Sequence, residues 1–108
     1  MLKRYDLQTS CPVELALQLV GDRYKAIIVI ELLSGKKRFT ELKKAIHGIS
    51  QKVLTDHLRL MEKYELITRE VFAEVPPRVE YSLTETGRSL KPIIDTMIKW
   101  GDEYRAAL

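Results

Sequence analysis

The chain has 108 residues, of which 45% are hydrophobic and 31% are charged, and it carries a net charge of +3 with an isoelectric point near 9.0. These values describe one globular domain with a modest core, of a size at which a domain often depends on a partner. The longest apolar stretch, AIIVIELL, is too short to span a membrane, and the N-terminus lacks the apolar segment of a secretory signal, so we expect a cytoplasmic protein with no membrane association.

Two helices are predicted between residues 12 and 35. Pro12 suits the first position of a helix, because its missing N–H needs no partner there, and the apolar spacing continues as far as Val20. Asp22 can cap a second helix, RYKAIIVIELLS, which Gly35 is expected to end.

Two further helices are predicted to form a helix-turn-helix unit over about residues 40–64. Thr40 is expected to cap the short helix ELKKAI, and Ser50 is expected to cap a longer helix after a three-residue turn. The apolar residues of the longer helix recur at helical spacing and should face the core; they are Val53, Leu54, Leu58 and Met61.

After the longer helix the apolar period changes from 3.6 to 2, which predicts a β-hairpin over about residues 67–83. Pro76 and Pro77 cannot continue the ladder of backbone hydrogen bonds, so they are expected to form the loop of the hairpin.

A closing helix is predicted over about residues 89–108, with Thr84 as a plausible cap. Gly87 and Pro92 lie in its early part, so it is expected to be kinked there or to begin late. Its apolar stripe is too long for one small core.

The predicted order is therefore α-α-α-α-β-β-α in a single domain of residues 1–108, mainly α with a small β-hairpin. A helix-turn-helix unit followed directly by a hairpin is the arrangement of a winged helix, in which the hairpin is the wing.

The polar face of the longer helix mixes amide, hydroxyl, acid and base, unlike the Glu/Lys alternation of a solvated helix. In a helix-turn-helix protein this helix lies in the major groove of DNA, where Lys and Arg can donate to phosphates or guanine, Gln can pair with adenine and Asp can accept from cytosine. Asp56 has a second interpretation, in which it pairs with Lys52 one turn away. We predict contact with double-stranded DNA through Ser50, Gln51, Lys52, Thr55, Asp56 and Arg59.

Basic charge is concentrated around this helix. Residues 36–59 carry seven basic and two acidic side chains, a net charge of +5, whereas residues 1–35 are neutral and residues 60–108 carry −2. Such a distribution indicates a phosphate-binding surface, although a solvated Lys-rich face has the same composition.

Basic residues before and after the helix-turn-helix unit are further candidates for phosphate contacts. Lys37 and Arg38 lie in the loop before it, together with Lys36. Arg78 follows the two prolines of the wing and is expected to reach a phosphate or the minor groove, with Arg69 as a weaker second candidate; an exposed arginine without a partner is the alternative.

Enzymatic chemistry is not indicated. The two histidines, His47 and His57, are ten residues apart, and HExxH, CxxC and GxGxxG motifs are absent from the sequence. We expect no cofactor and no metal ion. A single cysteine cannot form an intramolecular disulfide and effectively excludes a structural zinc site.

The single cysteine, Cys11, directly precedes Pro12 at a predicted helix N-terminus. The helix dipole and the N–H groups there favour a reactive thiolate, so Cys11 is a candidate redox sensor. A small hydrophobic residue beside a helix start is the alternative interpretation.

The motifs CPVE, RFTEL, GISQKVLT, PPRVEYSLT and GRSL, with a closing W-G, together resemble the HxlR family of bacterial winged-helix transcription regulators, which are related in fold to MarR-type regulators. The resemblance extends from Cys11 to Gly101. One departure is Tyr24, where a tryptophan is typical of the family.

This resemblance implies a homodimer that binds DNA and acts as a repressor or an activator. It places the dimer interface on the first and last helices, about residues 12–20 and 89–108. Several members respond to electrophiles or oxidants through the cysteine of the CP motif, which matches Cys11. The resemblance does not identify the signal of this chain, which could be a small molecule or an oxidant. The implied interface residues are Leu15, Leu19, Ile94, Met97, Ile98, Trp100 and Tyr104.

Two other functions compete with DNA binding. A winged helix that docks another protein would carry exposed aromatic or large aliphatic anchors on the outer face of the longer helix, and this face is polar and basic instead. An enzyme would need a cluster of titratable groups that the sequence does not indicate.

Overall fold

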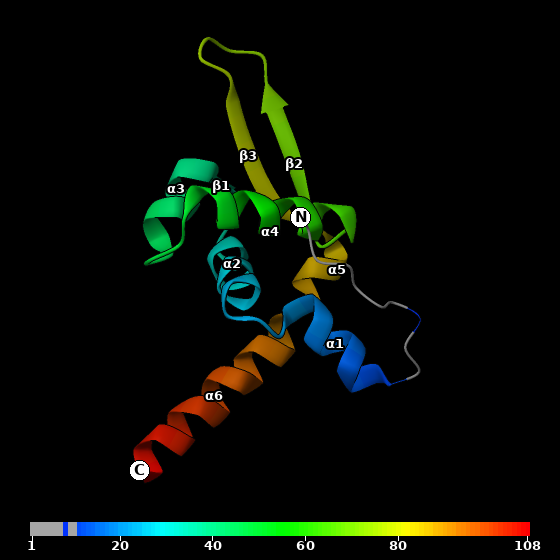
Figure 1. The fold of residues 1–108 in the computed structure, drawn as a ribbon, viewed down its shortest axis with the longest axis vertical. Helices are drawn as coiled ribbons and strands as arrows, with labels where there is room; N and C mark the ends of the chain where they lie inside the picture. The colour runs from blue at the N-terminus through cyan, green and yellow to red at the C-terminus, as the bar shows by residue number, and fades with distance from the viewer. Residues whose placement is uncertain (1–7, 9–10) are drawn as a thin grey trace.

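The structure, a computed structural model, describes residue 8 and residues 11–108. Its elements form a winged helix, as predicted, with a helical body and a projecting hairpin (Figure 1). They are, in chain order, α1 (Pro12–Val20), α2 (Arg23–Leu33), β1 (Lys37–Arg38), α3 (Phe39–Ala45), α4 (Gln51–Lys63), β2 (Ile67–Phe72), β3 (Arg78–Leu83), α5 (Glu85–Arg88) and α6 (Lys91–Ala107).

The helix-turn-helix unit consists of α3 and α4. The prediction that Thr40 caps α3 is wrong: Arg38 is the N-cap residue, its backbone N–H donates to Glu41 Oε1 at 2.8 Å, and Thr40 lies inside the helix. The turn before α4 uses Gly48 with φ +82°, a left-handed conformation that glycine adopts without steric cost.

The wing belongs to a three-stranded antiparallel sheet in the order β1-β3-β2. Strand β1 was not predicted, because a two-residue strand has no periodicity of its own and exists only through its pairing with β3. On β3, Glu80 lies opposite Arg38 of β1 and Glu70 of β2.

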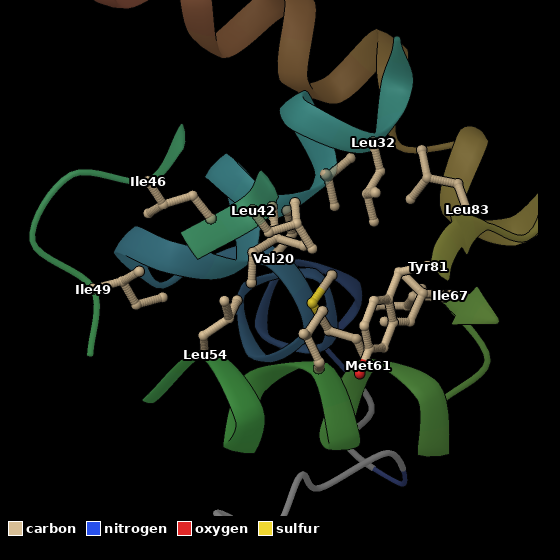
Figure 2. Packing of buried hydrophobic residues seen from close by; sticks show 14 of the residues in the cluster. Val20, Leu32, Leu42, Ile46, Ile49, Leu54, Met61, Ile67, Tyr81 and Leu83 are labelled. Atoms are coloured by element: carbon tan, nitrogen blue, oxygen red, sulfur yellow. The ribbon is translucent and has the colours of Figure 1, made fainter. Parts of the chain in front are cut away.

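The core joins α2, α3, α4 and the base of the sheet (Figure 2). Leu54, Leu58 and Met61 are fully buried and anchor α4, as predicted, while Val53 packs at the edge. Across from them lie Leu32 of α2, Leu42 of α3, and Ile67, Tyr81 and Leu83 of the sheet.

The closing helix begins late, as predicted. Thr84 caps the short α5 instead, accepting from the Gly87 backbone N–H at 2.9 Å and donating to the Glu65 carbonyl at 2.6 Å. Gly87 packs so closely on the Leu66 carbonyl that a Cβ would collide with it. The chain turns again before α6, which has Pro92 in its first turn.

Helices α1 and α6 lie at the opposite end of the molecule from the wing, and α6 extends away from the body (Figure 1). The molecule measures 50 × 35 × 26 Å along its principal axes. Most of α6 is exposed, which agrees with a stripe too long for one small core.

Candidate nucleic-acid interface

The N-terminus of α4 is defined by a hydrogen bond from the Val53 backbone N–H to Ser50 Oγ, at 3.1 Å. This confirms Ser50 as the N-cap of the helix. Because three apolar residues fix the inner face of α4, its outer face points away from the core, with Gln51, Lys52 and Arg59 exposed and Thr55 and Asp56 half-buried.

Lys52 and Asp56 form an ion pair on this face, with Nζ and Oδ2 2.8 Å apart. The hydrogen bond from Lys52 lowers the pKa of the Asp56 carboxyl from its ordinary value. The pairing that was the second interpretation of Asp56 is therefore present in the structure.

A cavity of about 480 Å³ opens between α4 and the wing. Its lining includes the apolar side chains of Phe39, Leu58 and Val79 together with Tyr81. Polar residues from both elements complete its lining; they are Gln51, Thr55, Arg59 and Glu62 from α4 and Arg69 from β2.

Arg78 is held by its neighbours on the wing. Its guanidinium carbon lies 4.0 Å from the centroid of the Phe72 ring, and its nitrogens lie 3.3 Å from Glu74 Oε1 and 3.4 Å from Glu80 Oε2. Its side chain is 27% exposed. In this structure Arg78 is a component of the wing surface and not an extended side chain at the tip.

The basic loop before α3 is ordered by the sheet. Lys37 pairs with Tyr81 and Arg38 with Glu80 across β1 and β3, while Lys36 Nζ lies 3.8 Å from Glu80 Oε1. These three cations therefore lie at the edge of the sheet, close to the N-terminus of α3.

A polar cluster that was not predicted from the sequence links α4 to the rest of the body. Asp22 caps α2 through its Oδ1, which accepts from the Tyr24 and Lys25 backbone N–H groups. Its Oδ2 lies 3.2 Å from both Lys25 Nζ and His57 Nε2. Lys25 is only 4% exposed, and its Nζ also donates to the Gln18 carbonyl at 2.6 Å. The sequence did contain one indication of this cluster, because Lys25 lies on the apolar side of its helix, three residues after the acidic cap Asp22.

Cys11 is exposed and occupies the N-cap position of α1. No side-chain capping hydrogen bond is present at this position. The thiol is thus accessible at the helix N-terminus where the sequence placed it.

Helices α1 and α6 expose a large apolar surface. Trp100 and Tyr104 stack with ring centroids 5.2 Å apart and are 64% and 55% exposed. Ile94 requires a correction, because it is 1% exposed and belongs to the core of the protomer, and Leu19 is partly buried against that core. The other large exposed residues on these two helices are Val13, Leu17, Ile93, Met97 and Ile98, and Leu108 follows the end of α6.

In the described part of the chain, no three histidine, cysteine, aspartate or glutamate side chains are grouped as metal ligands would be. Among those same residues, no helix has the length and apolarity that crossing a membrane requires.

Residues 19–107 match the HxlR-like helix-turn-helix family. The uncharacterised HTH-type transcriptional regulator YdeP of Bacillus subtilis is 48% identical over 96 residues, which cover 89% of this chain and 75% of YdeP.

Solved structures of similar proteins have the same fold. The redox regulator HypR in its reduced form has a TM-score of 0.84 and 44% identity, covering 88% of this chain and 94% of HypR; the oxidised form has a TM-score of 0.81. A transcriptional regulator of the MarR family from Porphyromonas gingivalis W83 has a TM-score of 0.83 and 40% identity, covering 94% of this chain and 97% of that protein.

Proposed function

The chain belongs to the HxlR-like helix-turn-helix family, and from this membership we propose that it is a dimeric transcription regulator that binds double-stranded DNA at specific sequences. The observation that carries the proposal is the exposed outer face of α4, which combines amide, hydroxyl and basic groups beside the wing. Buried apolar residues already fix the helix on the body, so the outer face is available to a partner with a polyanionic backbone.

In this proposal α4 lies in the major groove. Gln51 presents an amide that pairs with adenine, and Arg59 presents a guanidinium that pairs with guanine or a phosphate. Thr55 offers a hydroxyl and a methyl group. Lys52 and Asp56 act as a pair, in which the carboxylate fixes the position of the ammonium group.

The flanking contacts go to the DNA backbone, where they set the register without reading sequence. Lys37 and Arg38 lie at the sheet edge and are proposed for this role. The prediction of a contact from Arg78 requires its guanidinium to leave Glu74 and Glu80. The salt dependence of DNA binding by the Arg78→Gln and Arg69→Gln variants decides between these two arginines.

The proposed dimer forms through the exposed apolar residues of α1 and α6. Two copies related by a twofold axis would present their α4 helices to successive major grooves, about 34–36 Å apart. Leu17 and Val13 of α1 and Trp100 and Tyr104 of α6 supply the large exposed side chains that such an interface needs. Leu15, Leu19, Met97 and Ile98 are retained as interface candidates, whereas Ile94 is already covered within the protomer.

Cys11 is the proposed redox-sensing residue. HypR, a relative with 44% identity, is described as a redox regulator and has been solved in both reduced and oxidised forms. When the oxidant is a diazene such as diamide, the Cys11 thiols of two copies would give up two protons and two electrons to its N=N bond, forming a disulfide and a hydrazine. This bond would alter the spacing of the two α4 helices.

An electrophoretic shift assay on the DNA upstream of the gene tests the proposal. We expect a sequence-dependent complex at micromolar protein that weakens steeply with salt, because binding releases counterions from the phosphates. Lys52→Ala or Arg59→Ala should weaken it more than Lys99→Ala on α6. Absence of any salt-sensitive, sequence-dependent complex would refute the proposed function.

The role of Cys11 is tested separately by titrating the complex with diamide. The wild-type complex should respond to the oxidant and the Cys11→Ser complex should not. An identical response of both proteins would eliminate Cys11 as the sensor while leaving DNA binding intact.

A further inference from the structure

The two arginines of the wing lie on opposite faces of the sheet. Arg69 of β2 lies opposite Tyr81 of β3, and Arg78 lies opposite Phe72. Because side chains alternate along a strand, Arg69 shares the face of the buried Ile67 and Tyr81, which is turned toward α4, whereas Arg78 shares the outer face with Glu80. The two arginines of the wing therefore lie in different environments.

The outer face already neutralises its arginine. Glu74 and Glu80 both lie within 3.4 Å of the Arg78 guanidinium, and the Phe72 ring covers one side of it. Contact with a phosphate there would require two carboxylates to be displaced, and those carboxylates would themselves repel the DNA backbone.

The α4-facing side has the opposite character. Arg69 and Arg59 line the same cavity of about 480 Å³ between α4 and the wing, and neither forms an ion pair within the described part of the chain. Gln51 and Thr55 add an amide and a hydroxyl to the lining. Among the described residues that line this cavity, the exposed Glu62 is the only one with a carboxylate, so these charged side chains give the lining a net charge of +1.

Two guanidinium groups with amide and hydroxyl donors in the same lining can bind a tetrahedral oxyanion, since guanidinium binds phosphate oxygens through paired N–H donors. The cavity lies beside the proposed base-reading residues of α4. With α4 in the major groove, the DNA backbone would pass between this helix and the wing. A backbone phosphate is therefore the anion that the position of the cavity favours.

We propose that Arg69, together with Arg59, binds one backbone phosphate of DNA in the cavity between α4 and the wing, and that Arg69 is the principal phosphate-binding arginine of the wing. The proposal rests on the proposed function. It adds to that function a contact from Arg69, which was the weaker second candidate on the wing from the sequence. Arg69 follows the buried Ile67 by two residues, and this period of two places it on the α4 side.

The experiment measures fluorescence anisotropy of the full chain with a duplex from its own upstream region and with an unrelated duplex of equal length, from about 0.05 to 0.5 M salt. Arg69→Gln should reduce the slope of log K against log salt by about 0.9, so that the ratio of wild-type to variant affinity changes about eight-fold per ten-fold change in salt. The loss should be the same for both duplexes, because a phosphate carries no sequence information. Arg69→Lys retains the charge and should recover most of the slope.

Arg78→Gln is the matched control on the same wing, and it should leave the slope unchanged. Arg105→Gln on α6, whose partner is Asp102, controls for the change in net charge. Thermal unfolding of each variant shows that it is folded before the slopes are compared.

A wild-type slope in Arg69→Gln, or a reduced slope in Arg78→Gln instead, would overturn the phosphate site while leaving the proposed function standing. A cavity that binds free phosphate alone would also leave the DNA slope unchanged and would overturn it. Failure of the wild-type chain to bind either duplex would refute the proposed function itself.

Discussion

His57 Nε2 on α4 lies 3.2 Å from Oδ2 of Asp22, the residue that caps α2. His57 Nδ1 lies 2.9 Å from the Val53 carbonyl of its own helix, which fixes the ring between the inner and outer faces of α4. The same Asp22 carboxylate contacts the buried Lys25, which reaches the end of α1 through the Gln18 carbonyl. One carboxylate thus connects α1, α2 and the helix proposed to bind DNA.

Asp22→Ala should lower the free energy of unfolding by about 1–2 kcal/mol, because it removes an N-cap whose oxygen accepts from two backbone N–H groups. Asp22→Asn keeps an oxygen that can cap the helix and should cost less. Denaturant unfolding measures both. Asp102→Ala removes an exposed carboxylate from α6 and should change stability by no more than about 0.5 kcal/mol. Equal losses for Asp22→Ala and Asp102→Ala would contradict the role of the cap.

Acid should remove part of the contribution of Asp22. Burial tends to raise the pKa of its carboxyl, but the hydrogen bonds and charge of Lys25, with the nearby His57, outweigh burial and hold the pKa below its ordinary value of 3.8. A lowered native pKa means that the stabilisation is complete above the unfolded pKa and is lost as the pH falls through the native one. The stability difference between wild type and Asp22→Asn should therefore shrink as the pH falls below about 4. A difference that grows on acidification would contradict this sign.

Asp56→Asn should increase affinity for unrelated DNA and reduce discrimination between operator and unrelated duplexes. The substitution removes a negative charge from the outer face of α4 and releases Lys52 from its 2.8 Å ion pair, so that the ammonium group can reach many phosphates. Anisotropy titrations with both duplexes at one salt concentration measure the ratio. An unchanged ratio of the two affinities would show that the ion pair does not orient Lys52 on DNA.

Trp100→Ala and Ile94→Ala should affect different properties, although both residues lie on α6. Trp100 is exposed and stacked on Tyr104, so its removal should weaken self-association by about 30-fold, as expected for an interface residue contributing about 2 kcal/mol. Ile94 lies in the core, so Ile94→Ala should lower the free energy of unfolding by about 2–5 kcal/mol.

Sedimentation equilibrium measures the association, and denaturant unfolding measures the stability. Glu103→Ala, a change to another exposed residue of α6, is the control for both. A monomeric wild-type protein, or a Trp100→Ala protein that associates like the wild type, would contradict the interface.

Much of the fold follows from local signals in the sequence. Pro12, Asp22 and Ser50 begin helices because each satisfies or omits a backbone N–H at a helix start, a property that depends on only a few neighbouring residues. The periods of 3.6 and 2 placed α4 and the two strands of the wing, since these periods decide which residues share a face. Arg38 displaced Thr40 as the cap of α3 because the preceding β1 strand, paired with β3, fixes where that helix can begin.

The sequence by itself thus determined the five longer helices, the hairpin and the polar face of α4, because capping and periodicity act over a few residues. Only the tertiary structure decided which side chains meet across the molecule. In the folded protein, Ile94 lies in the core and Asp22, which caps α2, lies beside His57 of α4. Arg69 lies on the face of the wing that is turned toward α4, whereas Arg78 lies on the other face and pairs with Glu74 and Glu80. These relationships depend on how elements far apart in the chain pack, and no periodicity within one element encodes the charge or the surface that it will face.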